Sequence, residues 1–412
     1  MYKERLISDT LKRLFEAFPA VVICGARQVG KSTLIRHIYP EMDYVLFDSV
    51  QDIGRARSDP DYFLNNHPAP LILDEIQYAP ELVSSIKRRI DMNKRPGMYL
   101  LTGSQQWSVM KAISDSLAGR IIILTLEGFS LSEIHQLAES RQWLGRWLES
   151  PEEFIRTKPK RIPMQRTLAE QLWRGWLPEA DLVSLDQIPR FYNTYVQTYI
   201  ERDVRAYSDI SDLEEFGRFI QLISALTAKE IIPTQLGREI GINPHTAQKW
   251  LRILSATFQW FSVYAYHGNA IKRISGKKKG YMADTGLVCA QLMITSPKAL
   301  AGHPMMGFLF ETVVFAEIRK QSYTLSGAPG IYHWRSHGGA EVDFILERNG
   351  VLFPIEVKLK SRPGRSDTTG ITAFRKTYPN LRIAPGLVIA PCERFEQISE
   401  HDYCLPWDTI CP

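Results

Sequence analysis

The chain has 412 residues, which is enough for roughly two to four domains. With 44% hydrophobic and 23% charged residues, it has the composition of a globular protein and not that of a disordered chain. The net charge of +5 is compatible with a nucleic-acid partner but is too small to indicate one.

The N-terminal stretch MYKERLISDTLKRLFEAFPA is charged and amphipathic, unlike a signal peptide, and no apolar run is long enough to span a bilayer. We therefore expect a cytoplasmic protein with no membrane partner. The cysteines are scattered and form no CxxC pair, which favours a reducing compartment over a disulfide framework or a structural zinc site. They are Cys24, Cys289, Cys392, Cys404 and Cys411.

Short apolar runs separated by polar, helix-like stretches dominate the first third of the chain. Parallel strands that are buried on both faces have such near-continuous Val, Ile and Leu runs. We therefore predict an α/β domain built on a parallel sheet and assign residues 1–135 to it. The runs are AVVICG (20–25), DYVLF (43–47), PLILDE (70–75), GMYLLTGS (97–104) and RIIILTL (120–126).

The next stretch, residues 136–214, lacks such runs and is rich in Trp, Leu, Arg and Glu. We predict a helical lid or linker, with loops at residues 151–163 and 176–181. Two further predicted domains follow, at residues 215–286 and 287–412. Their expected elements are a strand at 258–266, a helix at 308–321 and strands at 331–336, 340–346, 352–359 and 386–390.

A phosphate-binding motif follows the first apolar run. The sequence GARQVGKS matches GxxxxGK[ST] and opens the helix-like stretch STLIRHIY. Glycines let the backbone wrap around phosphate, the lysine places a charge against the β- and γ-phosphates, and the serine hydroxyl binds Mg²⁺. A chance match in a strand–helix turn is the alternative, but strand, loop and helix are all in place. The predicted nucleotide-binding residues are Gly25, Ala26, Arg27, Gln28, Val29, Gly30, Lys31, Ser32 and Thr33.

Two acids at the end of the third run complete this predicted site. Asp74 would hold Mg²⁺ together with Ser32, and Glu75 would orient and activate the attacking water. An acidic pair after a strand is otherwise often the start of a solvated loop. The fourth run ends in Thr102 and Ser104, and we predict that Ser104 senses the γ-phosphate. The alternative is an ordinary turn, because Ser and Thr are common turn formers at strand ends.

Arg120 comes just before the fifth run. An arginine at this place can reach the nucleotide of a neighbouring subunit and stabilise the charge of the transition state. A surface salt bridge is the alternative. The predicted catalytic residues are thus Lys31, Glu75 and Arg120, with ATP and Mg²⁺ as cofactors.

In these motifs the chain resembles the bacterial and archaeal AAA-type ATPases that carry a C-terminal domain of unknown function. The resemblance covers nearly the whole chain except residues around 136–172. It implies an AAA-like P-loop domain, a winged helix-turn-helix and a restriction-endonuclease-like domain, in this order, within an α/β multidomain protein. The segments that carry it are GARQVGKSTL, LILDEIQ, LTGSQ, SLAGR, EGFSLSE, ERDV, KGYMADTGL, GFLFETVVFAEI, HWRSHGGAEVDF and PIEVKLK.

A helix-turn-helix pattern lies in residues 233–254. Leu236 and Ile240 lie on one helical face, Gly241 marks the turn, and Pro244 takes the first position of a second helix. The outward residues would contact DNA, with phosphate contacts from Lys277–Lys279 on a wing. A scaffold helix with a solvated face is the alternative. The predicted outward residues are His245, Gln248, Lys249 and Arg252.

Acids and a lysine near residues 341–358 resemble the PD-(D/E)xK pattern of metal-dependent nucleases. The turn Asn349-Gly350 makes two strands neighbours, one with Asp343 and the other with Glu356 and Lys358. Together with Glu311 from the preceding helix, Asp343 and Glu356 could bind Mg²⁺, and Lys358 could stabilise the developing phosphorane charge. Such alternation is also typical of a half-exposed strand, and such domains can keep the fold without catalysis.

The sequence therefore predicts an ATP-binding protein, a Mg²⁺-dependent ATPase that couples its nucleotide state to a DNA transaction through a nuclease-like C-terminal domain. One alternative is an ATP-gated regulatory switch whose C-terminal domain docks a protein and cuts nothing. Another is a transcription regulator that binds DNA through the helix-turn-helix. The possible partners are ATP, DNA, a second copy of the chain and a partner protein.

Overall fold

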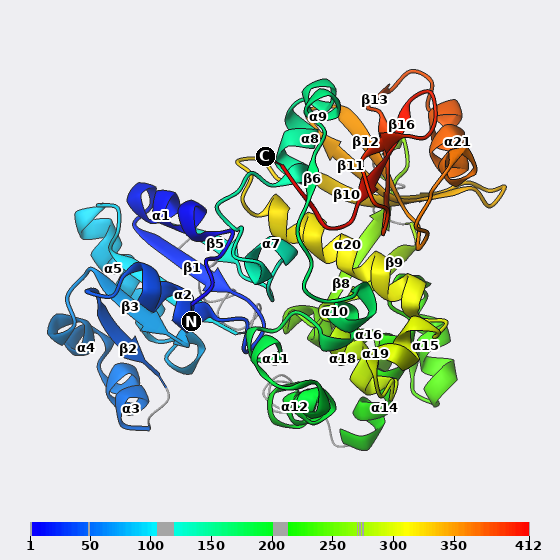
Figure 1. The fold of residues 1–412 in the computed structure, drawn as a ribbon. Helices are drawn as coiled ribbons and strands as arrows, with labels where there is room; N and C mark the ends of the chain where they lie inside the picture. The colour runs from blue at the N-terminus through cyan, green and yellow to red at the C-terminus, as the bar shows by residue number, and fades with distance from the viewer. Residues whose placement is uncertain are drawn as a thin grey trace.

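The computed structural model describes residues 2–47, 50–104, 119–200, 213–269, 271, 273 and 276–411. Figure 1 shows a first sheet with its helices at one end of the molecule, and the helices and second sheet of the later residues at the other. The helix α20 (Met306–Ser322) runs between these parts and faces both.

The first sheet is made of all five strands that the apolar runs predict. Its order is β2-β3-β4-β1-β5, and every pair in it is parallel. All residues of β1, β3 and β4 are buried, as expected of central strands with helices on both faces. The strands are β1 (Ala20–Cys24), β2 (Asp43–Leu46), β3 (Leu71–Asp74), β4 (Tyr99–Gly103) and β5 (Ile121–Thr125).

Helices pack around this sheet and bury their apolar sides against it. In α1, for example, Leu11 and Phe15 point into the core one helical turn apart. The helices are α1 (Ser8–Ala17), α2 (Lys31–Ile38), α3 (Val50–Ser58), α4 (Pro60–Asn66) and α5 (Leu82–Asn93), with a 3-10 turn η1 (Ile76–Tyr78).

The middle of the chain is helical, as predicted, but the two expected loops each contain a short helix. Helix α9 (Pro151–Thr157) starts where the Ser150 hydroxyl accepts a hydrogen bond from the Glu153 N–H at 3.4 Å, and proline takes its first position. Helix α11 (Pro178–Leu182) also begins at a proline. The other elements are α7 (Leu131–Ile134), α8 (Trp143–Glu149), α10 (Leu168–Arg174), η2 (Leu185–Gln187), α12 (Ile188–Tyr195) and the π-helix η3 (Val196–Ile200).

The predicted pair of helices at 233–254 is present. Helix α15 (Pro233–Ile240) ends at Gly241, whose φ of 80° is left-handed. Asn243 caps α16 (Pro244–Ala256) by accepting the His245 N–H at 2.8 Å. Helix α14 (Leu213–Ala225) precedes this pair, and Trp250 packs edge-on against its Phe216 at 5.3 Å.

The second sheet joins strands from residues on both sides of the boundary predicted at 286. Its order is β15-β16-β14-β12-β11-β10-β8-β9-β7, and β10 pairs in parallel with β8. The strands are β7 (Lys229–Ile231), β8 (Trp260–Ala265), β9 (Lys278–Met282), β10 (Gly330–Arg335), β11 (Glu341–Arg348), β12 (Val351–Val357), β14 (Gly386–Ala390), β15 (Glu396–Gln397) and β16 (Asp402–Pro406), with β13 (Arg382–Ile383) beside β12.

Helices α18 (Thr285–Gln291), α19 (Pro297–Ala301), η4 (Arg365–Thr368) and α21 (Thr369–Thr377) complete this region. The strand β17 (Thr409–Ile410) leaves it and pairs with β6 (Lys160–Arg161) of the helical middle. All residues of α20 except Gly307 and Phe308 are buried, so this helix is a shared core element.

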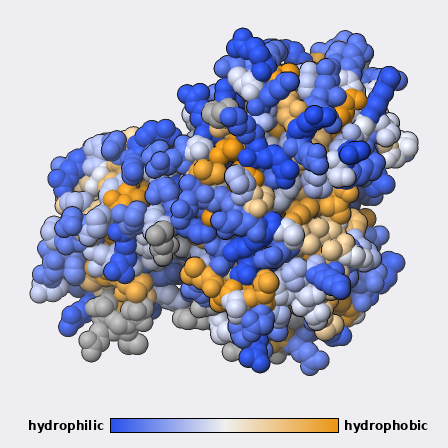
Figure 2. All heavy atoms as spheres, in the orientation of Figure 1, coloured by the Kyte–Doolittle hydropathy of each residue, from blue (hydrophilic) through white to orange (hydrophobic). Residues whose placement is uncertain are grey.

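Figure 2 shows that hydrophilic residues cover most of one face, with hydrophobic residues in several separate patches. Within the described residues, no helix combines the length and the apolar character that crossing a bilayer requires.

Candidate functional site

The phosphate-binding loop connects β1 to α2 and has the backbone that its glycines permit. A Cβ on Gly25 would lie 2.0 Å from the Leu126 carbonyl oxygen, so no side chain fits there. Gly30 has a φ of 93° and Gln28 a φ of 61°, both left-handed. The loop thus turns tightly before α2 and leaves the N-terminus of that helix open to an anion.

Lys31 is the first residue of α2 and is buried, with 5% of its surface exposed. Its Nζ donates to the carbonyl oxygens of Gly25 at 2.9 Å and Ala26 at 2.8 Å. Burial lowers the pKa of this ammonium, and the carboxylates of Glu75 and Asp74 partly oppose that shift. The loop therefore holds a positive charge that is desolvated and ready to meet phosphate oxygens.

Asp74 ends β3 next to this loop, and its side chain is fully buried. Its carboxylate accepts hydrogen bonds from the hydroxyls of Thr102 and Tyr44. Tyr44 also bonds to the Ser32 hydroxyl, and burial is the main reason that the pKa of this phenol is raised. Ser32 and Asp74 thus face one point, and a hydroxyl and a carboxylate are the hard oxygen donors that suit Mg²⁺.

Glu75 follows Asp74 in a left-handed backbone conformation, with φ 61° and ψ 44°. Its N–H donates to the Thr102 hydroxyl at 3.0 Å, and its carboxylate accepts from the Gln77 amide. The same Gln77 nitrogen donates to the Ser104 hydroxyl at 3.1 Å. Ser104, at the end of β4, thus fixes the carboxylate of Glu75 in its place.

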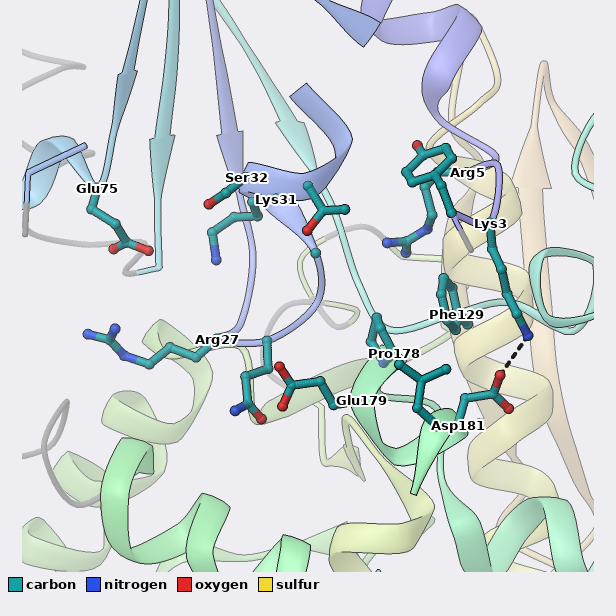
Figure 3. Close-up of a pocket in the computed structure, with 15 residues that line it drawn as sticks. Lys3, Arg5, Arg27, Lys31, Ser32, Glu75, Phe129, Pro178, Glu179 and Asp181 are labelled. Carbon is teal, nitrogen blue, oxygen red and sulfur yellow. Dashed lines mark hydrogen bonds and ion pairs between the residues drawn. The ribbon is translucent and has the colours of Figure 1, made fainter. Parts of the chain in front are cut away.

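Lys31, Ser32 and Glu75 line a cavity of about 400 Å³ between the loop, the N-terminal segment and α11, whereas the fully buried Asp74 does not line it. Figure 3 shows Lys31 and Glu75 directed into this space, with the ion pair of Lys3 and Asp181 on its other side. Gly25, Ala26 and Val29 do not line the cavity, whereas the rest of the predicted loop does. The lining residues are Tyr2, Lys3, Arg5, Arg27, Gln28, Gly30, Lys31, Ser32, Thr33, Glu75, Phe129, Pro178, Glu179, Asp181 and Leu182.

Arg120 lies away from this cavity. Arg120 precedes β5, whose first residue pairs with Ala20 at the start of β1. The phosphate-binding loop follows the end of β1, so Arg120 lies at the opposite end of the strands. Its guanidinium forms an ion pair with Asp91 at 2.5 Å, and 32% of its side chain is exposed. Within one chain, Arg120 is therefore remote from Lys31.

The predicted nuclease-like acids lie in the second sheet and in α20. Glu311 and Asp343 both contact the ammonium of Lys279, at 2.5 Å and 3.2 Å. The Tyr281 hydroxyl donates to Glu311 at 2.7 Å, and the other oxygen of Asp343 accepts the Val357 N–H at 2.9 Å. A cavity of about 320 Å³ borders this cluster.

Glu356 lies on β12, and its carboxylate accepts from the Lys358 ammonium at 2.5 Å. Burial, with Asp343 nearby, raises the pKa of Glu356 to about 8, and the same two causes raise that of Glu311 to about 8. In the described residues, no group of three or more His, Cys, Asp and Glu is arranged to hold a metal ion. The Lys279 ammonium contacts both Glu311 and Asp343, so these carboxylates, paired with a cation of the chain, do not fit the predicted nuclease-like metal site.

The outward face of α16 is as the sequence predicts. His245, Gln248, Lys249 and Arg252 are all exposed, and Gln248 accepts a hydrogen bond from Arg252 at 3.1 Å. Of the basic run, Lys277 and Lys278 are exposed, whereas Lys279 is partly buried and forms the ion pairs described above.

Sequence reasoning did not find Tyr44, Gln77 or the structural role of Lys279. Tyr44 lies in an ordinary strand pattern, so only the pairing of β2 with β3 brings it to Asp74. Gln77 lies two residues after Glu75, which is the one signal that could have pointed to it. The basic run of Lys277–Lys279 is evident in the sequence, but nothing in the sequence pairs Lys279 with Glu311.

Three regions of the chain match described families. Residues 17–135 match the AAA domain, residues 165–298 match a domain of unknown function (DUF8612), and residues 306–410 match another domain of unknown function (DUF4143). The uncharacterized proteins Rv2008c of Mycobacterium tuberculosis and Mb2031c of Mycobacterium bovis are each 24% identical over 412 residues, which covers 100% of this chain and 85% of theirs.

Solved structures with some likeness include the Walker-type ATPase of Pyrococcus abyssi, at 14% identity and a TM-score of 0.37, covering 69% of this chain and 94% of that one. A RuvB variant of Thermotoga maritima has 16% identity and a TM-score of 0.28, covering 62% and 88%. TM-scores this low support no statement about function. The strand order, the loop and the family match together give a mixed α/β chain with an AAA-type, P-loop ATPase-like domain, followed by regions of undefined function.

Proposed function

We propose that this chain binds ATP with Mg²⁺ in the cavity beside the phosphate-binding loop and hydrolyses it. The observation that carries the proposal is that Lys31, Ser32 and Glu75 line one cavity, while the buried Asp74 is joined to Ser32 through the Tyr44 hydroxyl. A desolvated ammonium, two oxygen donors for Mg²⁺ and a carboxylate held at the cavity are what phosphoryl transfer to water requires.

Each residue has a separate role in this proposal. Lys31 exchanges its bonds to the loop carbonyls for bonds to the β- and γ-phosphates. Ser32 and Asp74 would hold Mg²⁺, which neutralises phosphate charge when bound. Glu75 orients the attacking water and accepts its proton, with its carboxylate held through Gln77 and Ser104.

Arg120 enters this proposal only between two copies of the chain. Arg120 lies at the end of the strands that is far from the phosphate-binding loop. From there it suits contact with the nucleotide site of a neighbouring copy, where its guanidinium would stabilise the transition state. The proposal therefore expects Arg120→Ala to lower turnover only at concentrations at which copies associate.

The test is ATP binding and hydrolysis by the purified chain. Glu75→Gln keeps the shape of the side chain but removes the base, so we expect ATP affinity to stay and turnover to fall by about 10²–10⁴-fold. Lys31→Ala should lose binding itself. Exposed Lys298→Ala is the matched control and should behave like the wild type. Full turnover in Glu75→Gln would overturn the assigned role.

A second proposal concerns what the nucleotide state controls. The exposed polar face of α16 supports a DNA contact, which would couple ATP to a DNA transaction. We expect Lys249→Ala with Arg252→Ala to weaken binding to duplex DNA and to reduce its salt dependence, measured by gel shift. Unchanged DNA binding would favour the alternative function of a regulatory switch, in which ATP gates the docking of a protein.

The acidic residues of the C-terminal region favour a region that does not cleave DNA. Glu311 and Asp343 are committed to Lys279, which leaves no arrangement for metal-dependent cleavage. We expect no cleavage of single- or double-stranded DNA with Mg²⁺ or Mn²⁺, with or without ATP. Cleavage that is lost in Asp343→Asn would instead establish the nuclease.

A further inference from the structure

The acidic cluster in the second sheet contains a cation that belongs to the chain itself. Lys279 has 12% of its side chain exposed, and its ammonium lies 2.5 Å from a Glu311 oxygen and 3.2 Å from an Asp343 oxygen. The two carboxylates come from α20 and β11, and the lysine comes from β9. Three distant segments of the sequence therefore meet at one charge.

The strand β9 is built to deliver this side chain. Alternation along a strand places Lys279 and Tyr281 on the same face, and both contact the same oxygen of Glu311. Gly280 lies between them on the strand, and a Cβ there would lie 1.8 Å from the Trp260 ring. The ring of Trp260 in β8 therefore covers the opposite face of β9. The neighbouring Lys278 points away, with its ammonium 4.3 Å from the Tyr264 ring centroid.

The remaining polar atoms of the cluster show what the lysine compensates. One Glu356 oxygen is buried and has no hydrogen-bond partner. Glu311, Asp343 and Glu356 thus place three acidic groups in one poorly solvated region. Burial, followed by repulsion from Asp343, raises the pKa values of Glu311 and Glu356. A buried group of this kind needs a cation, and Lys279 and Lys358 are the cations that contact it.

We propose that Lys279 takes the place of a divalent metal ion between Glu311 and Asp343 and that the hairpin of β8 and β9 thereby keeps this site closed to metal. The single charge of the ammonium offsets one of the two carboxylate charges, whereas a divalent ion would offset both, and the ammonium provides no open coordination position for water or a phosphodiester. The same carboxylates become a metal site when the lysine charge is removed. This inference does not depend on ATP hydrolysis.

The test is Mn²⁺ binding in the absence of nucleotide, measured by titration calorimetry and by the electron paramagnetic resonance of free Mn²⁺. We expect Lys279→Met to bind one Mn²⁺ that the wild type does not bind. Lys279→Met with Asp343→Asn should lose this ion again. Lys278→Met is the matched control on the same strand, and it should bind no additional Mn²⁺.

Two results would overturn the inference. One is Mn²⁺ binding by the wild type that disappears in Asp343→Asn, because the site would then accept metal with Lys279 in place. The other is a folded Lys279→Met protein that takes up no additional Mn²⁺.

If Lys279→Met does not fold alone, circular dichroism after refolding decides the question. We then expect Mn²⁺ to restore the fold, and the uncharged combination of Lys279→Met, Glu311→Gln and Asp343→Asn to fold without it. Failure of both rescues would mean that the lysine acts through its packing and not as a cation, which also overturns the inference.

Discussion

Among single residues, Gly25 most directly connects the sequence to the shape of the phosphate-binding loop. A side chain there would meet the Leu126 carbonyl, whose backbone belongs to the strand end beside the loop. The loop would have to move, and with it the carbonyls that hold Lys31. Gly54 provides the contrast, because a Cβ there meets nothing within 4 Å and the residue is exposed in α3.

We predict that Gly25→Ala destabilises the protein by about 1–3 kcal/mol and abolishes ATP binding, since an overpacked loop loses its phosphate-binding shape. Gly54→Ala should instead stabilise α3 by about 0.5–1 kcal/mol, because alanine is the better helix former. Urea denaturation and nucleotide titration measure both effects. Equal behaviour of the two variants would contradict the role of Gly25.

Among the elements, the helix pair α15 and α16 depends on its turn. The Asn243 side chain satisfies the His245 N–H at the start of α16, and Gly241 supplies the left-handed residue that ends α15. The orientation of the exposed face of α16 follows from this turn. A weakened cap would therefore affect both stability and any contact made by that face.

We predict that Asn243→Ala lowers the free energy of unfolding by about 0.5–2 kcal/mol, because the helix loses its capping acceptor. Asn243→Asp keeps an acceptor and should stay close to the wild type. Thermal denaturation distinguishes the two. An alanine variant as stable as the aspartate variant would show that the cap contributes nothing here.

Elements whose signal is local could be predicted from the sequence. The three central parallel strands β1, β3 and β4 are buried on both faces, so each appears as a continuous apolar run. The turn at Asn349 and Gly350 adopts the left-handed φ values that its residues prefer. The sequence predicts a loop where α9 lies, because residues 151–163 are rich in proline and lysine. A start signal for this helix is Ser150, whose hydroxyl caps its first turn.

The candidate sites divide in the same way. Lys31, Ser32, Asp74 and Glu75 lie within motifs, so their grouping follows from strand order alone. The pairing of Lys279 with Glu311 joins segments 32 positions apart in the chain and depends on how β9 packs against α20. No spacing rule encodes such a contact.

For the whole molecule, α20 connects the two sites. The Arg5 guanidinium donates to the carbonyls of Val29, in the phosphate-binding loop, and of Glu127, at 2.7 Å and 2.6 Å. The Glu127 carboxylate pairs with Arg319 of α20 at 2.5 Å. Glu311 lies eight residues earlier on the same helix, about 12 Å away along its axis. Buried contacts therefore join the phosphate-binding loop to the helix that carries Glu311.

We predict that Arg319→Met destabilises the protein by about 3–5 kcal/mol, because it leaves the Glu127 carboxylate buried without its cation. Arg394→Met removes an exposed pair with Glu396 and should cost no more than about 1 kcal/mol. Calorimetric unfolding of both variants tests the difference. Similar small losses would mean that the ion pair of Arg319 with Glu127 contributes little to holding α20 against the segment that follows β5.

The parallel pairing of β8 with β10 has a consequence for any attempt to separate the chain into pieces. A fragment that begins after residue 286 would keep β10 but lose the strand beside it, and would uncover the apolar side of α20. The open edge offers unpaired N–H and C=O groups to any extended chain nearby. We therefore expect the C-terminal region, when it is produced alone, to self-associate through the open edge of β10. Joining this region to another protein at residue 286 should give aggregates and not a folded domain that can be exchanged.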